Sequence, residues 1–363
     1  MRKKILILGP DLKATGGVAN YYNTLGLHNL DDIGYFAVNS SEPQSGLKIM
    51  FRLIFNYFKF SYIVVKKHYK IIHVNPSLDK RSFYRDAFFL ILTHLLGRKS
   101  LVFFRGWLDE YEDTIKKSFM KSFLFRMSYA KAGWYIVLSE SFRKKLIGMG
   151  VSEKTTFYIE TTVADSQGIN KLNLEEKLTT YDKKLDLLFL SRIEKAKGIY
   201  IAIDAFKKFM GKYPDRETSL IIAGDGPELP AVKEYVERLT IPKIRFTGYI
   251  TNDLKRKVLL ESHIMFFPSY TEGLPNTILE GMIYGMPVIS RITGGIPDVI
   301  TQGVNGYLSE SFDPSIFVDF LSILAYDRDL DRQIALNNHT KAIGNYTTEK
   351  VKDRILRIYE AIC

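Results

Sequence analysis

The chain has 363 residues, of which 46% are apolar and 13% aromatic, and this composition excludes intrinsic disorder as its main state. At roughly 100–200 residues per domain, the length favours two domains with separate cores. The single cysteine, Cys363, excludes intrachain disulfides and cysteine-ligated metal sites and suits a reducing compartment.

The net charge of +11 is unevenly distributed. Residues 1–165 hold 25 Lys and Arg against 14 Asp and Glu, whereas residues 166–363 hold 26 of each. This asymmetry indicates either an anionic partner for the first half, such as a membrane surface, a nucleic acid or an acidic ligand, or only a solvated basic surface. Because the chain carries no nucleic-acid-binding motif, we expect no nucleic acid as partner.

The sequence predicts a cytoplasmic protein that is at most peripheral at the inner face of a membrane. The apolar run at 5–8 is too short for the core of a signal peptide. No window of 18 residues lacks a charge, so we expect no transmembrane helix.

Short apolar strands alternate with helices in the first half. Strands are predicted at 4–8, 71–74, 101–104, 134–138 and 156–159, and helices at 18–27, 47–69, 84–96 and 115–131. Fully apolar short strands that are separated by helices are typical of a parallel, doubly wound sheet.

A polar stretch interrupts this pattern, and we interpret residues 166–184 as a linker. The second half predicts strands at 185–190, 219–223, 244–247, 264–267 and 287–290, and helices at 198–213, 228–239, 253–262, 277–284 and 348–362. We therefore predict an α/β protein with two doubly wound domains, residues 1–165 and 185–345. Ligands bind at the carboxyl ends of the strands in such sheets, so two facing domains would form a cleft for two substrates.

The predicted helix within residues 47–70 is rich in Phe, Tyr, Ile and Lys. A basic, aromatic helix can lie at a membrane interface. Apolar stripes on helices usually face a core, however, so we favour a helix that packs on the sheet. Its charge still fits an anionic membrane surface.

Two loops that follow predicted strands can bind phosphate. Gly16 and Gly17 end the first loop, where they permit close approach of the backbone to a phosphate or sugar, or form only a tight turn. Arg192 and Lys197 follow the strand at 185–190. Arginine offers a bidentate fork to a phosphate and lysine a point charge.

Two further glycine turns also follow strands. Gly224 opens a turn that either binds a ligand or only connects strand and helix, and Gly294 with Gly295 forms another site of close approach. The six histidines show no H-x3-H pair, so we expect no zinc site.

The strongest candidate is the segment SYTEGLPNTILEGMIYGMPVIS at 269–290. We expect Glu272 in a loop, Asn276 as the cap of a helix that begins at Thr277, and Glu280 in its first turn. The free N–H groups of such a helix start bind anions, whereas carboxylates accept hydrogen bonds from sugar hydroxyls. The segment therefore predicts a binding site for a sugar phosphate or nucleotide sugar. Taken alone, Glu280 also fits a second interpretation, in which it only stabilises the helix as an acid near its start.

Four motifs follow one another along the chain: R-x4-K-G at 192–198, G-D-G-P at 224–227, F-x-G at 246–248 and PSYTEGLPNTILEGMIYGMP at 268–287. Together they resemble glycosyltransferase family 4, across essentially the whole chain. The resemblance implies the GT-B fold, in which two Rossmann-like domains face each other across a central cleft and the last helix, here 346–363, packs back on the first domain. It also implies a metal-independent, retaining sugar transfer without a cofactor.

The resemblance assigns roles to the charged candidates. Arg192 and Lys197 would bind the diphosphate of a UDP- or GDP-sugar donor. Glu272 would hold the hydroxyls of the transferred sugar near the reacting carbon, and Glu280 would accept the ribose hydroxyls. The acceptor would be a glycan or a lipid-linked glycan, in the synthesis of a cell-surface polysaccharide.

The resemblance also assigns the remaining contacts. Leu274, Asn276 and Thr277 would contact phosphate through backbone or hydroxyl groups. Tyr249 would lie near the nucleobase, and Gly17 would approach the donor from the opposite domain.

One position departs from the family pattern. Many relatives carry His-Gly where this chain has Arg105-Gly106. Because arginine stays protonated, Arg105 cannot act as a neutral base, but it can bind a phosphate. Two alternative functions stay open: a sugar-nucleotide epimerase on the same fold, and a non-catalytic subunit that binds nucleotide sugars.

Overall fold

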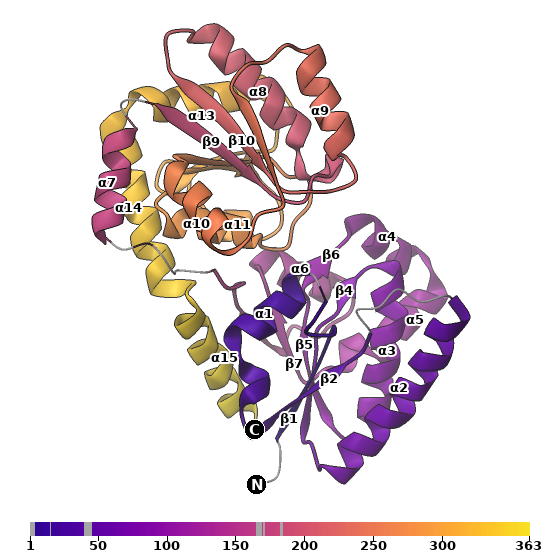
Figure 1. The fold of residues 1–363 in the computed structure, drawn as a ribbon. Coiled ribbons are helices and arrows are strands. Elements are labelled where there is room, and N and C mark those ends of the chain that lie inside the picture. Colours follow the sequence, from indigo (N-terminus) through magenta and orange to yellow (C-terminus); the bar gives the residue numbers. More distant parts are fainter. Residues whose placement is uncertain (1–3, 15, 40–45, 165–168, 170, 182–183) are drawn as a thin grey trace. The chain divides into compact units, whose positions relative to one another are not determined.

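The computed structural model describes residues 4–14, 16–39, 46–164, 169, 171–181 and 184–363. The chain forms two compact units (Figure 1): unit 1 comprises Met1–Thr162 with Thr348–Cys363, and unit 2 comprises Val163–Thr347. Each unit contains a six-stranded parallel sheet with helices on both faces. The predicted α/β class with two Rossmann-like, doubly wound units is confirmed.

The sheet of unit 1 has the strand order β2-β1-β3-β5-β7-β8, and all neighbours are parallel. Its strands are β1 (Ile5–Gly9), β2 (Ile33–Ala37), β3 (Ile71–Val74), β5 (Lys99–Phe103), β7 (Trp134–Val137) and β8 (Thr156–Ile159). A short pair, β4 (Ser77–Leu78) and β6 (Gly106–Trp107), lies beside it. The sequence prediction missed β2, because Gly34 and Tyr35 interrupt its apolar run.

Helices cover both faces of this sheet (Figure 1). They are α1 (Gly17–Leu25), α2 (Gly46–Lys66), α3 (Lys80–Leu95), α4 (Asp109–Lys117), α5 (Phe119–Met127), α6 (Glu140–Gly148) and α15 (Thr348–Ile362). Helices α1 and α15 pack together on one face, and α2 and α3 pack together on the other. The single helix predicted at 115–131 is wrong, because Ser118 breaks it by accepting a hydrogen bond from Lys121 N and so starting α5.

The C-terminal helix α15 is bound to unit 1 by buried polar contacts. The Tyr359 hydroxyl lies 2.6 Å from Nδ1 of His73, which is buried in β3. Nε of Arg354 donates to both carboxylate oxygens of Glu160, at 3.0 and 2.9 Å. These contacts fix the helix on the face that α1 also covers.

His73 makes the stability of unit 1 sensitive to acid. Burial, and next the charge of Arg105, lower the pKa of His73 to about 3. Unfolded His73 takes up a proton as the pH falls through its ordinary pKa, whereas folded His73 stays neutral, so its contribution to stability is lost as the pH falls. Between about pH 7.5 and pH 5 we expect this residue to remove about 2 kcal/mol from the free energy of unfolding.

Urea unfolding of His73→Gln at the two pH values checks this expectation. The variant should show a smaller loss on acidification than the parent chain. Tyr359→Phe is the matched control, because it removes the same hydrogen bond without changing an ionisable group of that pKa range, and it should lower stability equally at both pH values. An unchanged acid response in His73→Gln would contradict the prediction.

The sheet of unit 2 has the order β11-β10-β9-β12-β13-β14, again all parallel. Its strands are β9 (Leu185–Leu190), β10 (Thr218–Ala223), β11 (Ile244–Gly248), β12 (Ile264–Phe267), β13 (Val288–Arg291) and β14 (Gly306–Ser309). The sequence prediction did not include β14, whose side chains are mostly half-buried rather than buried.

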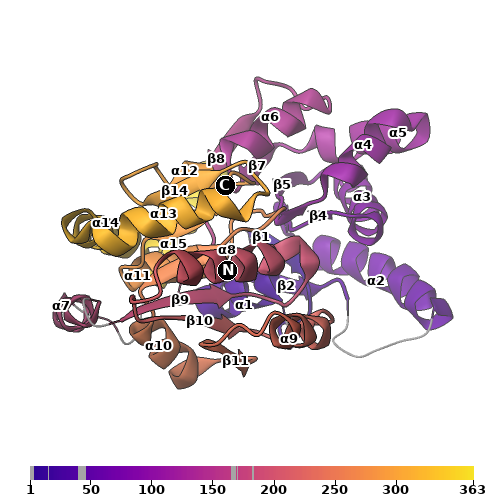
Figure 2. The ribbon, with the colours of Figure 1, turned by 90° about the horizontal axis from the view of Figure 1, so that it is seen from above.

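The helices of unit 2 are α7 (Lys171–Thr180), α8 (Ile199–Lys212), α9 (Leu229–Arg238), α10 (Asn252–Glu261), α11 (Asn276–Ile283), α12 (Ile296–Val299), α13 (Pro314–Tyr326) and α14 (Arg328–Asn345). Helix α8 packs against α9 and α13, and α11 packs against α14. Figure 2 shows α8 and α13 side by side over the sheet.

The linker prediction at 166–184 is wrong for its central part, which forms α7. Leu174 and Leu178 of this helix are buried with Ala335 of α14. Lys177 donates hydrogen bonds to two backbone carbonyls of unit 2, and burial lowers the pKa of Lys177 to about 7. The other linker positions at 166–168, 170, 182 and 183 lie outside the described residues.

The expectation that the apolar side chains of α2 face the sheet is only half correct. Phe60 and Val64 are buried, but Phe51, Phe55 and Phe58 are exposed. Within the described residues, no helix combines the length and the hydropathy that a bilayer crossing requires.

Candidate functional site

The order of the strands in unit 2 reverses between β9 and β12, which are neighbours in the sheet although β10 and β11 separate them in sequence. Ligands of doubly wound sheets bind at such a switch point, beyond the carboxyl ends of the strands. The two loops that leave this point, 191–198 and 268–275, contact each other, since Tyr270 N donates to Ala196 O at 2.8 Å.

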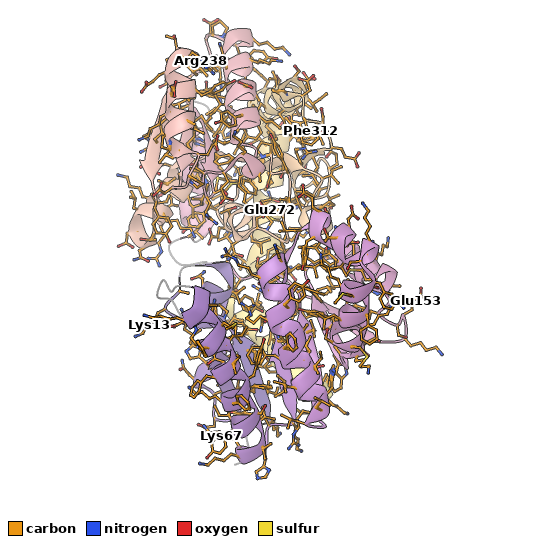
Figure 3. The ribbon with its side chains drawn as sticks, turned by 90° about the vertical axis from the view of Figure 1, so that its right-hand side faces the viewer. Lys13, Lys67, Glu153, Arg238, Glu272 and Phe312 are labelled. Carbon is orange, nitrogen blue, oxygen red and sulfur yellow. The ribbon has the colours of Figure 1, made fainter. Side chains whose placement is uncertain are left out.

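Two predicted site residues meet across these loops. Nζ of Lys197 lies 2.6 Å from Oε1 of Glu272, which Figure 3 labels. The Ser269 hydroxyl donates to the same carboxylate oxygen at 2.7 Å. Both charged side chains are largely buried. Sequence reasoning gave Ser269 no role, although it stands within the motif at 268–287.

The loop that carries Glu272 rests on Gly294. The φ angle of Gly294 is +55°, and a Cβ atom there would lie only 2.1 Å from Glu272 O. Gly295 N donates to Gly273 O at 2.6 Å. The predicted close approach at this glycine pair is therefore an approach of the chain to itself, which positions Glu272.

Gly294→Ala should displace the Glu272 loop. The left-handed backbone alone costs an alanine about 1–2 kcal/mol, and the collision with Glu272 O adds to it. We expect a larger loss of stability than in Gly303→Ala, since Gly303 has a φ of +71° but open space around its Cβ position. Thermal unfolding of both variants measures the difference. Equal losses of stability would show that the collision with Glu272 O does not destabilise the protein.

Arg192 and Gly224 lie beside the first loop. The Arg192 side chain is 73% exposed, and one of its terminal nitrogens lies 2.8 Å from Glu194 Oε1. Ile193 N donates to Asp225 O at 3.0 Å, and a Cβ on Gly224 would lie 1.8 Å from Ser191 O. Packing between the two turns accounts for Gly224, while Arg192 extends into solvent.

The start of α11 differs from the predicted one. The helix begins at Asn276 with Pro275 as its N-cap, so Asn276 is not the cap and Glu280 lies beyond the first turn. The reason is that Pro275, whose ring fixes its φ, already has the extended backbone of a cap position. Leu274 is buried before the helix. The Thr277 hydroxyl is buried and has no hydrogen-bond partner among the described residues.

Glu280 is buried in α11, and its Oε1 lies 2.6 Å from Nζ of Lys255 in α10. Sequence reasoning missed Lys255, because only the packing of α10 beside α11 brings the two residues together. The lysine offsets the cost of burying the carboxylate and holds it at a defined position.

Tyr249 follows β11 directly, and its side chain is 74% exposed. Gly224 N donates to Gly248 O at 2.8 Å, so the carboxyl ends of β10 and β11 lie together. Tyr249 therefore stands at the same edge of the sheet as the switch-point loops, with its ring free to stack on a ligand.

The three remaining predicted residues belong to unit 1. Gly16 is the N-cap of α1 and Gly17 its first residue, and a Cβ at either would meet no described atom within 4 Å. The Arg105 guanidinium carbon lies 4.0 Å from the ring centre of Tyr21 in α1 and 4.3 Å from that of Phe103. Burial lowers the pKa of Arg105.

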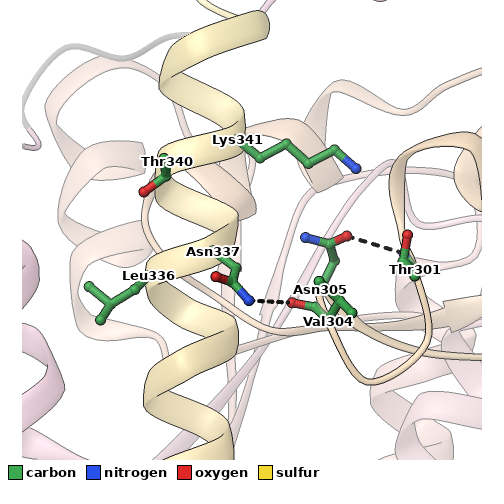
Figure 4. Close-up of a pocket in the computed structure, with 7 residues that line it drawn as sticks. All are labelled: Thr301, Val304, Asn305, Leu336, Asn337, Thr340 and Lys341. Carbon is green, nitrogen blue, oxygen red and sulfur yellow. Dashed lines mark hydrogen bonds between the residues drawn. The ribbon is translucent and has the colours of Figure 1, made fainter.

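A pocket elsewhere in unit 2 does not belong to this site (Figure 4). It is lined by Thr301, Val304, Asn305, Leu336, Asn337, Thr340 and Lys341. It opens beside the amino end of β14, whereas the site lies at carboxyl ends. Its amides bind other groups of the chain, since Asn337 donates to Val304 O and Asn305 to Asn338. We assign it a packing role.

Residues 170–341 match the family model described as Glycosyl transferases group 1. Unit 2 is a group 1 glycosyltransferase domain. The matched range contains the whole switch-point site, from Arg192 to Glu280. The resemblance to glycosyltransferase family 4 that the motifs predict is confirmed.

The curated relatives match through this group 1 domain. N-acetyl-alpha-D-glucosaminyl L-malate synthase of Bacillus anthracis is 28% identical over 203 residues, which are 56% of this chain and 51% of that protein. D-inositol 3-phosphate glycosyltransferase of Corynebacterium jeikeium is 26% identical over 181 residues, 48% of this chain and 43% of that protein. The chain thus spans about half the length of the curated relatives it matches.

Solved structures resemble the whole chain. HepE of Anabaena, in complex with UDP and glucose, has a TM-score of 0.75 at 16% identity and covers 99% of this chain and 100% of its own. Sucrose-phosphate synthase of Thermosynechococcus elongatus has a TM-score of 0.78 at 16% identity, with 99% of each chain covered. These likenesses confirm the predicted GT-B fold of the chain that carries the group 1 domain.

Proposed function

We propose that this protein transfers a sugar from a nucleoside-diphosphate sugar to a glycan or a lipid-linked glycan, with retention of the anomeric configuration. The cluster of Lys197, Glu272 and Ser269 carries the proposal, because it combines a cation and a hydroxyl-binding acid at the switch point of a group 1 domain. An ion pair with only a structural role would not need to lie beside the start of α11, where free backbone N–H groups can bind an anion.

The donor we propose is a UDP-hexose, with a GDP-hexose as the second to test. The HepE structure contains UDP and glucose, and its fold is that of this chain. Glu280, buried beside Lys255, would accept hydrogen bonds from the ribose, and the exposed ring of Tyr249 would stack on the base.

The chemistry needs stabilisation of a leaving diphosphate. The bond between the anomeric carbon and the diphosphate oxygen breaks, and a bond to the acceptor oxygen forms on the same face. The acceptor proton passes to a phosphate oxygen of the leaving group. Lys197, Arg192 and the N–H groups at the start of α11 would stabilise the negative charge that develops there. The proposal needs neither a metal nor a cofactor.

Unit 1 would bind the acceptor. Arg105 keeps its charge and stacks on Tyr21 and Phe103. It can therefore bind an anionic group of an acceptor, but it cannot accept a proton from it. Gly16 and Gly17, with open space around them, would let backbone N–H groups approach a phosphate. A lipid-linked acceptor of a cell-surface polysaccharide, presented at the cytoplasmic side, has both a phosphate and a sugar.

Thermal unfolding with UDP, GDP and their hexoses tests the proposal. A donor present at 100 times its dissociation constant should add about 2.7 kcal/mol to the stability. Release of nucleotide from a labelled donor, with and without acceptor and in the presence of EDTA, then separates the alternatives. An epimerised sugar without acceptor would show an epimerase, and binding without any release would show a binding subunit.

A further inference from the structure

Helix α2 carries apolar side chains on two opposite faces. The inner face packs on unit 1 through buried Phe60 and Val64, and the Tyr57 hydroxyl donates to Arg85 O of α3 at 3.2 Å. The outer face consists of Phe51, Ile54, Phe55, Phe58, Tyr62 and Val65, all exposed. At 3.6 residues per turn these six fall in one stripe about 100° wide. Phe51, Phe55 and Phe58 are 67%, 64% and 73% exposed.

The outer face is part of a larger apolar surface. Helix α2 lies on the outside of unit 1 beside α3 (Figure 1, Figure 2), and α3 contacts α5. Phe88 of α3 is half exposed and its ring lies 5.9 Å from that of Tyr57. On α5, Phe119 and Met120 are more than three-quarters exposed. An exposed apolar surface of this kind marks an interaction site.

Basic residues flank the stripe and acidic ones avoid it. Lys48, Arg52, Lys59 and Lys66 follow one another at spacings of 4, 7 and 7 residues, which places them along one side of the stripe. Residues 43–78 contain no Asp or Glu. Lys116, Lys117 and Lys121 lie within three residues of Phe119, the first residue of α5, and Lys116 pairs with Glu112 of α4. The surface therefore combines an apolar stripe with a one-sided positive charge.

We propose that this surface of α2 and α5 binds the anionic face of a lipid bilayer, with the aromatic side chains among the headgroups and the helix parallel to the membrane. Apolar side chains beside lysines fit this partner, because the lysine stems can extend to the phosphates while the rings enter the acyl boundary. A second copy of the chain fits poorly, since it would bring the same positive charges against the first.

Sedimentation of the full chain with vesicles tests this proposal. We expect binding to vesicles of phosphatidylglycerol and phosphatidylcholine in equal parts, and at least tenfold weaker binding to phosphatidylcholine alone, with salt weakening only the former. Phe55→Ser with Phe58→Ser should abolish sedimentation. The control Ile316→Ser with Ile323→Ser changes two partly exposed apolar residues of α13 in unit 2 and should bind as the parent chain does.

A charge variant separates the electrostatic part. Lys48→Gln with Lys59→Gln removes two exposed positive charges, and each is worth roughly a fivefold change, so binding to the mixed vesicles should weaken about 25-fold. Thermal unfolding should show that all three variants remain folded, and their nucleotide binding should stay at the parent level, which keeps this test independent of the proposed function.

Two results would overturn the proposal. One is equal binding of the parent and Phe55→Ser with Phe58→Ser to the mixed vesicles. The other is a dimer, measured by light scattering without vesicles, that dissociates in the same variant while neither chain sediments with lipid, since this would assign the surface to a second copy.

Discussion

Lys197→Met is expected to lower the kcat of sugar transfer by ~10²–10³, with a much smaller change in nucleotide affinity. The diphosphate of the bound donor is already negatively charged and gains a further negative charge as it departs. Loss of the lysine should therefore raise the barrier more than it weakens donor binding. Steady-state kinetics with a UDP-hexose and a saturating acceptor measure the effect. Lys195→Met is the matched control, because Lys195 stands in the same loop but is exposed and pairs with Glu228, at 3.6 Å, instead of with Glu272.

A double-mutant cycle with Glu272→Gln tells two roles of Lys197 apart. If Lys197 acts on the diphosphate and Glu272 on the sugar, both single losses should largely add in the double variant. If Lys197 only positions Glu272 through their 2.6 Å contact, the double variant should be no slower than Glu272→Gln. Normal turnover in Arg192→Ala with Lys197→Ala, in a chain that still folds, would remove both cations from the mechanism.

Glu280→Gln is expected to weaken nucleotide binding by about 10–100-fold, the usual cost of losing hydrogen bonds to a charged group. Glu280 would accept the ribose hydroxyls, so the sharper measurement uses two ligands. Calorimetry should show that the parent chain prefers UDP over its 2′,3′-dideoxy analogue, and that Glu280→Gln has lost this preference.

Glu261→Gln is the control for this prediction. Glu261 ends α10, is partly exposed, and pairs loosely with Arg245 at 3.6 Å. Its loss should therefore change neither the affinity for UDP nor the affinity for the dideoxy analogue. A full preference for UDP in Glu280→Gln would show that the ribose binds elsewhere. Lys255→Met adds a second check. Because this variant keeps Glu280 but removes the lysine that positions it, it should still prefer UDP over the dideoxy analogue, with a lower affinity for UDP.

Both acids of the site are paired with a lysine before any ligand is bound. Lys197 reaches Glu272 from the neighbouring loop, and Lys255 reaches Glu280 from the neighbouring helix. A carboxylate has about four lone-pair positions, so each acid can keep its lysine and still accept a hydroxyl. The two ion pairs thus fix the carboxylate oxygens that would accept hydrogen bonds from a sugar. This lowers the entropic cost of ordering the two side chains when the sugar binds.

The sequence alone determined the class of fold and the loops of the site. Runs such as 187–190 and 264–267 are apolar throughout, which only strands covered on both faces require. The chain order of strands and loops then placed Lys197 and Glu272 at carboxyl ends, because parallel strands all end at one edge. These conclusions depend on local pattern and connectivity, and the sequence contains both.

Only the tertiary structure decided which side chains meet and which faces stay open. Lys255 and Glu280 are 25 residues apart, and no local pattern links them. Helix α7 was hidden in a polar stretch, because its two buried leucines, Leu174 and Leu178, are too few to form an apolar stripe in the sequence. On α2, apolar residues occupy opposite sides, so periodicity could not tell the face that packs from the face that is exposed. Burial depends on the neighbouring elements of the fold, and a single helix does not specify them.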